Sequence, residues 1–236
     1  GEVLYRSGGP GRVWLVSAVL CALGALVAVA IPGDLGRTTP ASGADDGGRR
    51  FLHPAAVMPG TILLMGLMGF AAFGAFLSIH LDDLGIDDAG PYFLIYGVTI
   101  LVIRVLGARI PDRLGAGRTT TASLVAIATG CLVIALVASP VAIAAGTLVF
   151  SVGMSLLFPA LFGLAVNRAP ANERSHAVAT FSVFFDLSQG LGAPFLGIIV
   201  DAAGSDRAAF VAAAVAALAG LAMARIRLPR ATAPTA

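Results

Sequence analysis

The stretch AVMPGTILLMGLMGFAAFGAFLSIH, residues 56–80, decides the fold class of this chain, because it contains no Asp, Glu, Lys or Arg. About 20 mostly apolar residues in a helix are enough to cross the hydrocarbon core of a bilayer. A run of this length is too long for a strand of a membrane barrel, and in lipid its backbone groups must be satisfied within the segment. The stretch is therefore predicted to be a transmembrane helix.

Six further segments share this apolar character and are predicted to be transmembrane helices as well: 13–31, 91–107, 119–138, 141–166, 177–200 and 208–225. The composition agrees with this assignment, since 58% of the 236 residues are hydrophobic and 12% are charged. A soluble domain carries about 25% charged residues. The mean hydropathy is +0.92. The predicted fold class is an all-α membrane protein with seven transmembrane helices.

The 15 basic residues are all arginines, and their placement predicts the orientation of the helices. Eleven of them lie in the connections 32–55, 108–118 and 167–176 or between residue 225, which ends the last helix, and the C-terminus. The intervening connections and the N-terminal segment hold three, and the connection 81–90 holds four aspartates and no arginine. Short cytoplasmic loops carry the excess of basic residues. We therefore expect a multi-pass protein of a bacterial plasma (inner) membrane, with residue 1 outside and the C-terminus in the cytoplasm.

The chain is expected to divide into four parts. Residues 1–31 form an outer loop and one helix, and residues 32–55, rich in Gly, Pro, Ser and Asp, form a flexible cytoplasmic linker. Residues 56–226 form a six-helix half, and residues 227–236 form a cytoplasmic tail.

An internal repeat relates the first predicted helix to the last. Residues 1–32 are similar to residues 197–228 at a constant offset of 196, which pairs Trp14 with Phe210 and Gly24 with Gly220. Parallel repeats of this kind build the two halves of a large class of transporters. The repeat predicts that about five further helices precede residue 1 in the complete protein.

The connection GARIPDRLGAGR, residues 107–118, concentrates charge between two apolar segments. It resembles the signature loop of the major facilitator superfamily, Gly-x-Leu-Ala-Asp-Arg-x-Gly-Arg-Arg, in the copy found in the C-terminal half. Asp112, Arg113 and Gly115 match the motif in place, and Ala108 occupies the position of its first glycine. Arg109 and Arg118 add positive charge to the loop. Such a loop is either a latch that holds one conformation or an anchor at anionic headgroups.

The resemblance implies a fold and a mechanism. Residues 13–31 correspond to helix six, and residues 56–225 correspond to helices seven to twelve, which form the C-terminal half of a twelve-helix fold. The implied activity is secondary active transport by alternating access, in which two six-helix halves rock around a site near the bilayer midplane.

One ionisable residue lies near the middle of a predicted helix, where a charge is costly to place in the bilayer and indicates a functional or paired position. Asp186 falls within FSVFFDLSQGLG, and Ser182, Asp186 and Gln189 stand at i, i+4 and i+7, on one helical face. This stripe is expected to face other helices or a water-filled cavity. Asp186 either exchanges a proton or contacts substrate, or it is a packing residue hydrogen-bonded to a neighbouring helix.

Several other polar residues are candidates for a central cavity: Tyr96, Thr99, Ser151 and Ser155. Arg104 is expected to extend toward the headgroups or to pair with Asp186. His80 ends its helix at the outer face and is interpreted as an interfacial residue, with a proton relay as the alternative.

No enzyme signature, nucleotide-binding loop or cluster of metal ligands occurs in the sequence, so we expect no catalytic activity, cofactor or metal. The net charge of +2 gives no reason to expect nucleic-acid binding. The expected partners are a small-molecule substrate, protons, the lipid bilayer and the missing N-terminal half. Proton-coupled efflux is the preferred function, and the alternatives are sugar or metabolite uptake, a receptor-like seven-helix protein, and a truncated membrane protein without transport activity.

Overall fold

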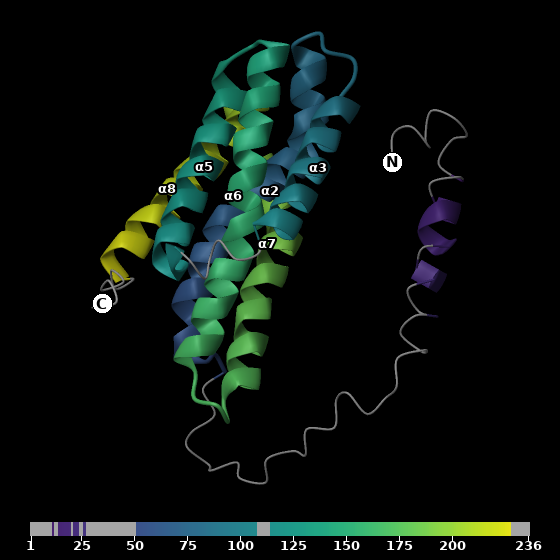
Figure 1. Ribbon diagram of the computed structural model, residues 1–236. Coiled ribbons are helices and arrows are strands. Elements are labelled where there is room, and N and C mark those ends of the chain that lie inside the picture. The colour runs from purple at the N-terminus through teal and green to yellow at the C-terminus, as the bar shows by residue number, and fades with distance from the viewer. Residues whose placement is uncertain are drawn as a thin grey trace. The chain divides into compact units, whose positions relative to one another are not determined.

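The computed structural model describes residues 51–107 and 114–227 continuously, together with residues 11, 14–19, 21–23 and 26 near the N-terminus. The chain divides into two units, residues 1–49 and 50–236 (Figure 1). In the first unit the described residues 14–19 and 21–23 are helical. The rest of the predicted helix 13–31, most of the linker and the tail lie outside the described residues, as does most of the first copy of the repeat.

The second unit contains six helices within its described residues: α2 Pro54–Asp83, α3 Gly90–Leu106, α5 Ala116–Leu136, α6 Pro140–Arg168, α7 Arg174–Ala203 and α8 Arg207–Arg227. Their ends agree with the six segments predicted after residue 55 to within three residues. Five of them, α2, α5, α6, α7 and α8, are long and apolar enough to cross a membrane, and α3 is apolar but has 17 residues. The predicted all-α membrane fold is confirmed.

The helix ends follow from local sequence signals. Proline stands in the first turn of α2, α3 and α6, where its missing N–H removes no helical hydrogen bond. Gly115 precedes α5 with φ 78°, in the left-handed region that a side chain would strain. The polar linker ends earlier than expected, because His53 is the N-cap of α2 and Pro54 is already helical.

Helix α2 contacts four of the other five helices, α5, α6, α7 and α8. In addition α5 packs on α6 and α8, α3 packs on α6, and α7 packs on α6 and α8. If α2, α3 and α5 are matched in order with α6, α7 and α8, the α2–α7 contact corresponds to the α6–α3 contact. The α2–α8 contact then corresponds to the α6–α5 contact. The unit thus has the pairing expected of two inverted three-helix repeats.

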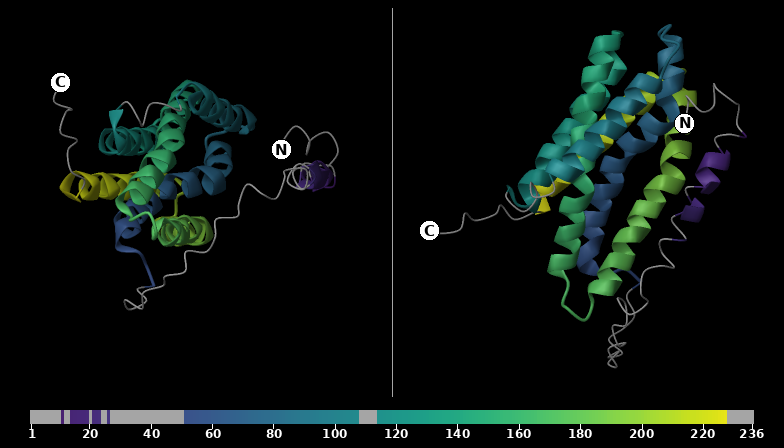
Figure 2. Two further views of the ribbon diagram at one scale, coloured as in Figure 1. Left: turned by 60° about the horizontal axis from the view of Figure 1, so that its bottom comes forward. Right: turned by 45° about the vertical axis from the view of Figure 1, so that its right-hand side comes forward.

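Helices α5 and α8 lie on one side of the bundle, and α3 and α7 lie on the other (Figures 1 and 2). This division matters for the site, because α3 and α7 are the helices with the least buried surface. Tyr92 is the fully buried residue of α3. On α7 the buried residues form one stripe, which is Ala177, Thr180, Phe181, Ser188, Gly192 and Leu196.

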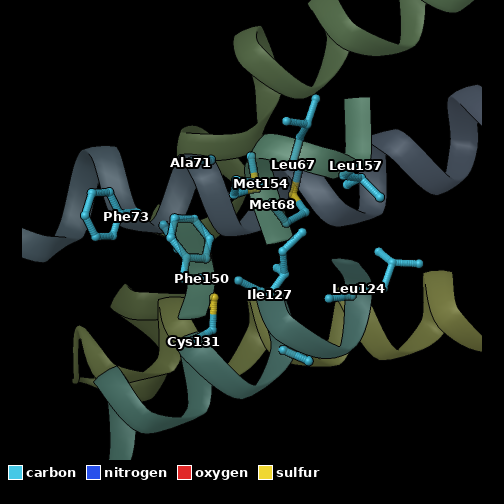
Figure 3. Close-up of a cluster of buried hydrophobic side chains, with 14 of the residues drawn as sticks. Leu67, Met68, Ala71, Phe73, Leu124, Ile127, Cys131, Phe150, Met154 and Leu157 are labelled. Carbon is cyan, nitrogen blue, oxygen red and sulfur yellow. The ribbon is translucent and has the colours of Figure 1, made fainter. Parts of the chain in front are cut away.

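The core lies where α2, α5 and α6 meet, and it is apolar (Figure 3). Phe73 of α2 stacks on Phe150 of α6 with ring centroids 5.1 Å apart. The closest approach of backbones is between α5 and α6, since a Cβ on Gly130 would lie 2.7 Å from the carbonyl oxygen of Gly146. Small residues at helix crossings let backbones approach in this way.

Candidate functional site

The polar stripe predicted on α7 lies on the uncovered face of that helix. Ser182, Asp186 and Gln189 are all exposed in the six-helix unit. Apolar residues elsewhere on the surface of α7 are exposed too, including Leu187 at 44% and Leu191 at 57%. Asp186 is the thirteenth of 30 residues in α7 and therefore lies near the middle of the helix. A carboxylate at that depth, on a face that the unit leaves uncovered, is the main feature of the candidate site.

Helix α3 carries the second group of candidates. Tyr96 is partly buried against aromatic rings of α2 and α6, with its ring centroid 5.0 Å from that of Phe73 and 5.9 Å from that of Phe150. Thr99 is partly exposed one turn further along the helix. Tyr96 therefore belongs to the packed aromatic cluster, and Thr99 is partly buried as Tyr96 is.

Arg104 lies in the last turn of α3 and is exposed. An arginine at such a position can extend its guanidinium group past the helix end while its methylenes remain in apolar surroundings. The alternative pairing with Asp186 is absent from the described part of the chain, whose ion pairs involve other residues.

The two serines of α6 do not reach the uncovered face. Ser151 is fully buried, and its hydroxyl donates to the carbonyl of Thr147 one turn earlier in the same helix, at 2.6 Å. Ser155 is 3% exposed, and its hydroxyl lies 3.5 Å from the carbonyl oxygen of Ile100 in α3. In this structure both residues lie within helix contacts instead of beside Asp186.

The signature loop is described only at its end. Ala108, Arg109, Asp112 and Arg113 lie outside the described residues. Gly115 adopts the positive φ noted above, and Arg118 is exposed in the first turn of α5. The described part of the loop therefore contains a glycine with positive φ and, three residues later, an exposed arginine.

A histidine that sequence reasoning left inside the linker joins the start of α2 to the start of α7. His53 is 5% exposed, and its Nε2 lies 2.7 Å from a carboxylate oxygen of Glu173. Its backbone N–H donates to the hydroxyl of Thr180 at 2.9 Å. Its Nδ1 accepts from the backbone N–H of Ala55, so Nδ1 is bare and Nε2 carries the proton. A neutral imidazole thus satisfies both contacts.

A second histidine joins the other end of α2 to the start of α8. His80 is 1% exposed, its Nδ1 lies 2.6 Å from Oδ2 of Asp206, and its Nε2 lies 2.9 Å from the carbonyl oxygen of Ile134 in α5. Its ring also packs against Phe210, with centroids 5.5 Å apart. His80 is therefore enclosed within the bundle by Asp206 and the ends of α5 and α8. The partners are 126 residues apart in sequence, so helical periodicity could not have revealed the pair.

The chain matches the family model described as Major Facilitator Superfamily over residues 1–192. It is 32% identical over 170 residues to an uncharacterized MFS-type transporter of Salmonella typhimurium, a match that covers 72% of this chain and 44% of the relative. It is also 32% identical over 162 residues to an uncharacterized MFS-type transporter of Pseudomonas aeruginosa, covering 69% of this chain and 40% of the relative. The MFS-type transporter YhhS of Salmonella typhi is 29% identical over 160 residues, covering 68% and 40%.

The matched regions thus span less than half the length of these relatives. The apolar helices, the pairing of inverted three-helix repeats and the match over residues 1–192 agree with one another. The chain is a multi-pass membrane protein that belongs to the major facilitator superfamily of transporters.

Proposed function

We propose that this chain forms one half of a proton-coupled efflux transporter, and that Asp186 on the uncovered face of α7 takes up and releases the coupled proton. The observation that carries the proposal is the exposed stripe Ser182, Asp186 and Gln189. A carboxylate at mid-helix costs about 2.5 kcal/mol or more to place in a bilayer, so it is retained at functional positions.

The rest of the transporter would cover the exposed faces of α7 and α3. Both helices expose apolar side chains along their length, and exposed apolar surface that includes a polar stripe suits a contact with another half around a wet cavity. The match covers about two-fifths of the length of these relatives. The remaining part of a protein of that length would be long enough to form the second half. Two halves rocking about a midplane site would expose Asp186 alternately to the two sides of the membrane.

The remaining candidates have supporting roles in this proposal. Gln189 and Ser182 flank Asp186 on the same face and offer hydrogen-bonding groups to a substrate. Thr99 would extend the polar surface onto α3, and Arg104 would anchor the end of that helix at the headgroups. The mainly apolar surroundings favour a small amphipathic substrate over a sugar, which would need many polar partners.

The arginine distribution supports one orientation. We propose that the connections before α2, α5 and α7, together with the C-terminus, face the cytoplasm of the inner membrane, and that residue 1 faces outside. The carboxylates between α2 and α3, four in residues 81–90, then lie on the outer side.

Asp186→Asn is expected to abolish proton-driven transport without loss of folded protein, because the amide keeps the size and polarity of the side chain but cannot exchange a proton. The measurement uses the full-length protein in inverted membrane vesicles. A panel of amphipathic fluorescent cations is followed with an imposed pH gradient and again after a protonophore has collapsed it.

Asp201→Asn is the matched control, because Asp201 is an exposed aspartate near the C-terminal end of the same helix. This variant should retain gradient-driven transport. Equal transport by Asp186→Asn and the parent would remove Asp186 as the coupling residue. Transport of the panel that runs with the proton gradient, instead of against it, would contradict efflux and favour uptake.

A further inference from the structure

We propose that His80 and Asp206 form a proton-binding site that clamps the end of α2 to the start of α8, and that loss of its proton opens this contact. The proposal does not rest on the proposed transport function, because it concerns a proton bound at one end of the bundle and needs no substrate. Asp186 lies elsewhere, on the uncovered face of α7.

The hydrogen-bond partners fix how many protons the closed pair holds. The carbonyl oxygen of Ile134 can only accept, so Nε2 of His80, 2.9 Å away, carries a proton. If Nδ1 were bare, it would face Oδ2 of an ionised Asp206 at 2.6 Å, with two acceptors and no hydrogen between them. A second proton must therefore lie between Nδ1 and Oδ2.

The helix ends around the pair favour an imidazolium beside a carboxylate. Ile134 lies in the last turn of α5, where carbonyl groups lack helical partners and a cation is stabilised. Asp206 directly precedes α8, where an anion is stabilised by the free N–H groups of the first turn. Nδ1 and Nε2 of His80 then donate to Asp206 and to Ile134 respectively.

The pair at the other end of α2 shows that this arrangement is not shared by every His–carboxylate contact. His53 needs one proton only, because its Nδ1 accepts from a backbone N–H. Its partner Glu173 has a side chain that is 51% exposed, whereas the side chain of Asp206 is 7% exposed. Water can therefore replace Glu173 as a partner of His53, but deprotonation of the His80 pair leaves an uncompensated charge in a buried place.

Other titratable groups lie at this end of the bundle. They are Asp82 and Asp83 on α2, Asp87 and Asp88 before α3, Tyr92 on α3, Cys131 on α5, Asp201 on α7 and Arg207 on α8. The charged ones are all exposed, so water and salt screen them. The first turn of α6, residues 140–143, carries no titratable side chain. The buried contacts of His80 and Asp206 therefore dominate the site.

Proton counting gives the expected pH dependence. A separated imidazole loses its proton near pH 6.5, and a separated carboxylate is ionised above about pH 4. Between these values the open and closed forms hold the same number of protons. Above about pH 7 the open form holds one proton fewer than the closed form, so the ratio of open to closed forms should rise with pH.

The experiment measures the distance between spin labels on α2 and α8 in the full-length protein in lipid nanodiscs. The labels are placed at Ser78 and Val211, which are exposed, after both cysteines have been replaced by alanine. We expect a longer-distance population whose ratio to the shorter one rises with pH between about pH 7 and pH 9. A ratio that stays constant over this range would overturn the proposal.

Asp206→Asn separates proton binding from a merely structural contact. The amide of asparagine can donate to a bare Nδ1, so the pair can close without binding a proton. This variant should remain closed and lose the pH dependence between about pH 7 and pH 9, whereas Glu173→Gln should keep the slope of the parent. An unchanged slope in Asp206→Asn would also overturn the proposal.

The imidazole ¹⁵N spectrum at about pH 7 provides a second readout, with His80→Gln used for assignment. His80 should show two protonated nitrogens in the parent and one in Asp206→Asn, and His53 should show one in both proteins. A bare His80 nitrogen in the parent would contradict the proton count.

Discussion

Gly130→Ala should destabilise the bundle by about 3 kcal/mol, toward the upper end of the cost of overpacking a helix contact. A Cβ at this position would lie 2.6 Å from Cβ of Phe150 and 2.7 Å from both the backbone nitrogen of Phe150 and the carbonyl oxygen of Gly146. Two of these three atoms belong to backbone, which cannot turn aside as a side chain does. Helices α5 and α6 must therefore move apart, and the apolar core between α2, α5 and α6 loses contacts. The measurement is the thermal unfolding midpoint of the full-length protein in detergent.

Two further glycine-to-alanine changes separate the effect of the α5–α6 clash from the effect of helix propensity. Helix propensity favours alanine over glycine by up to about 1 kcal/mol at all three positions. At Gly146 a Cβ would meet a side chain of Val133 at 3.0 Å and the Gly130 carbonyl at 3.1 Å, so Gly146→Ala should have a smaller effect. At Gly163 nothing lies within 4 Å, so Gly163→Ala should leave the midpoint unchanged or raise it. A midpoint for Gly130→Ala equal to that for Gly163→Ala would show that the α5–α6 approach is looser than described.

The helices of the second unit could be predicted from sequence because two local properties decide them. Long runs without charge must be helical in a bilayer, and the prolines and glycines at their ends stop them within a few residues. Residues 177–200 illustrate this, since the apolar run predicts the helix and Gly204, with φ 64°, ends it. The linker boundary was misplaced, since His53 is a polar residue whose burial depends on Thr180 and Glu173, far along the chain.

The candidate site was predictable where it depends on helical periodicity and not where it depends on contacts between helices. The spacing of Ser182, Asp186 and Gln189 places them on one face in any α-helix. Whether Ser151 and Ser155 face a cavity or a neighbouring helix depends on how α6 packs against α3, which the spacing does not specify.

The two histidine pairs depend on contacts between distant segments in the same way. Each joins an end of α2 to a helix that begins more than a hundred residues later. These pairs give α2, which like α6 contacts four other helices, a polar connection at each end. One is partly exposed and the other is buried, so their removal should have unequal effects on stability.

His80→Leu should destabilise the protein by about 3–5 kcal/mol, the cost of leaving one member of a buried ion pair without its partner. Leucine fills much of the volume of the imidazole ring against Phe210, so the loss comes mainly from polar groups. Asp206, 6% exposed, would lose the donor at 2.6 Å, and the carbonyl of Ile134 would lose the donor at 2.9 Å. The free energy of unfolding, from chemical denaturation in mixed micelles at about pH 7, measures this loss.

The double variant His80→Leu with Asp206→Leu tests whether the unpaired carboxylate causes the loss. Replacing both members of a buried pair by apolar residues is often neutral or stabilising, so the double variant should recover more than half of the stability lost by His80→Leu. Glu173→Leu, which removes the half-exposed carboxylate at the other end of α2, should cost no more than about 1 kcal/mol. A double variant no more stable than His80→Leu would instead assign the loss to the Ile134 carbonyl and to ring packing, because those contacts are missing in both proteins.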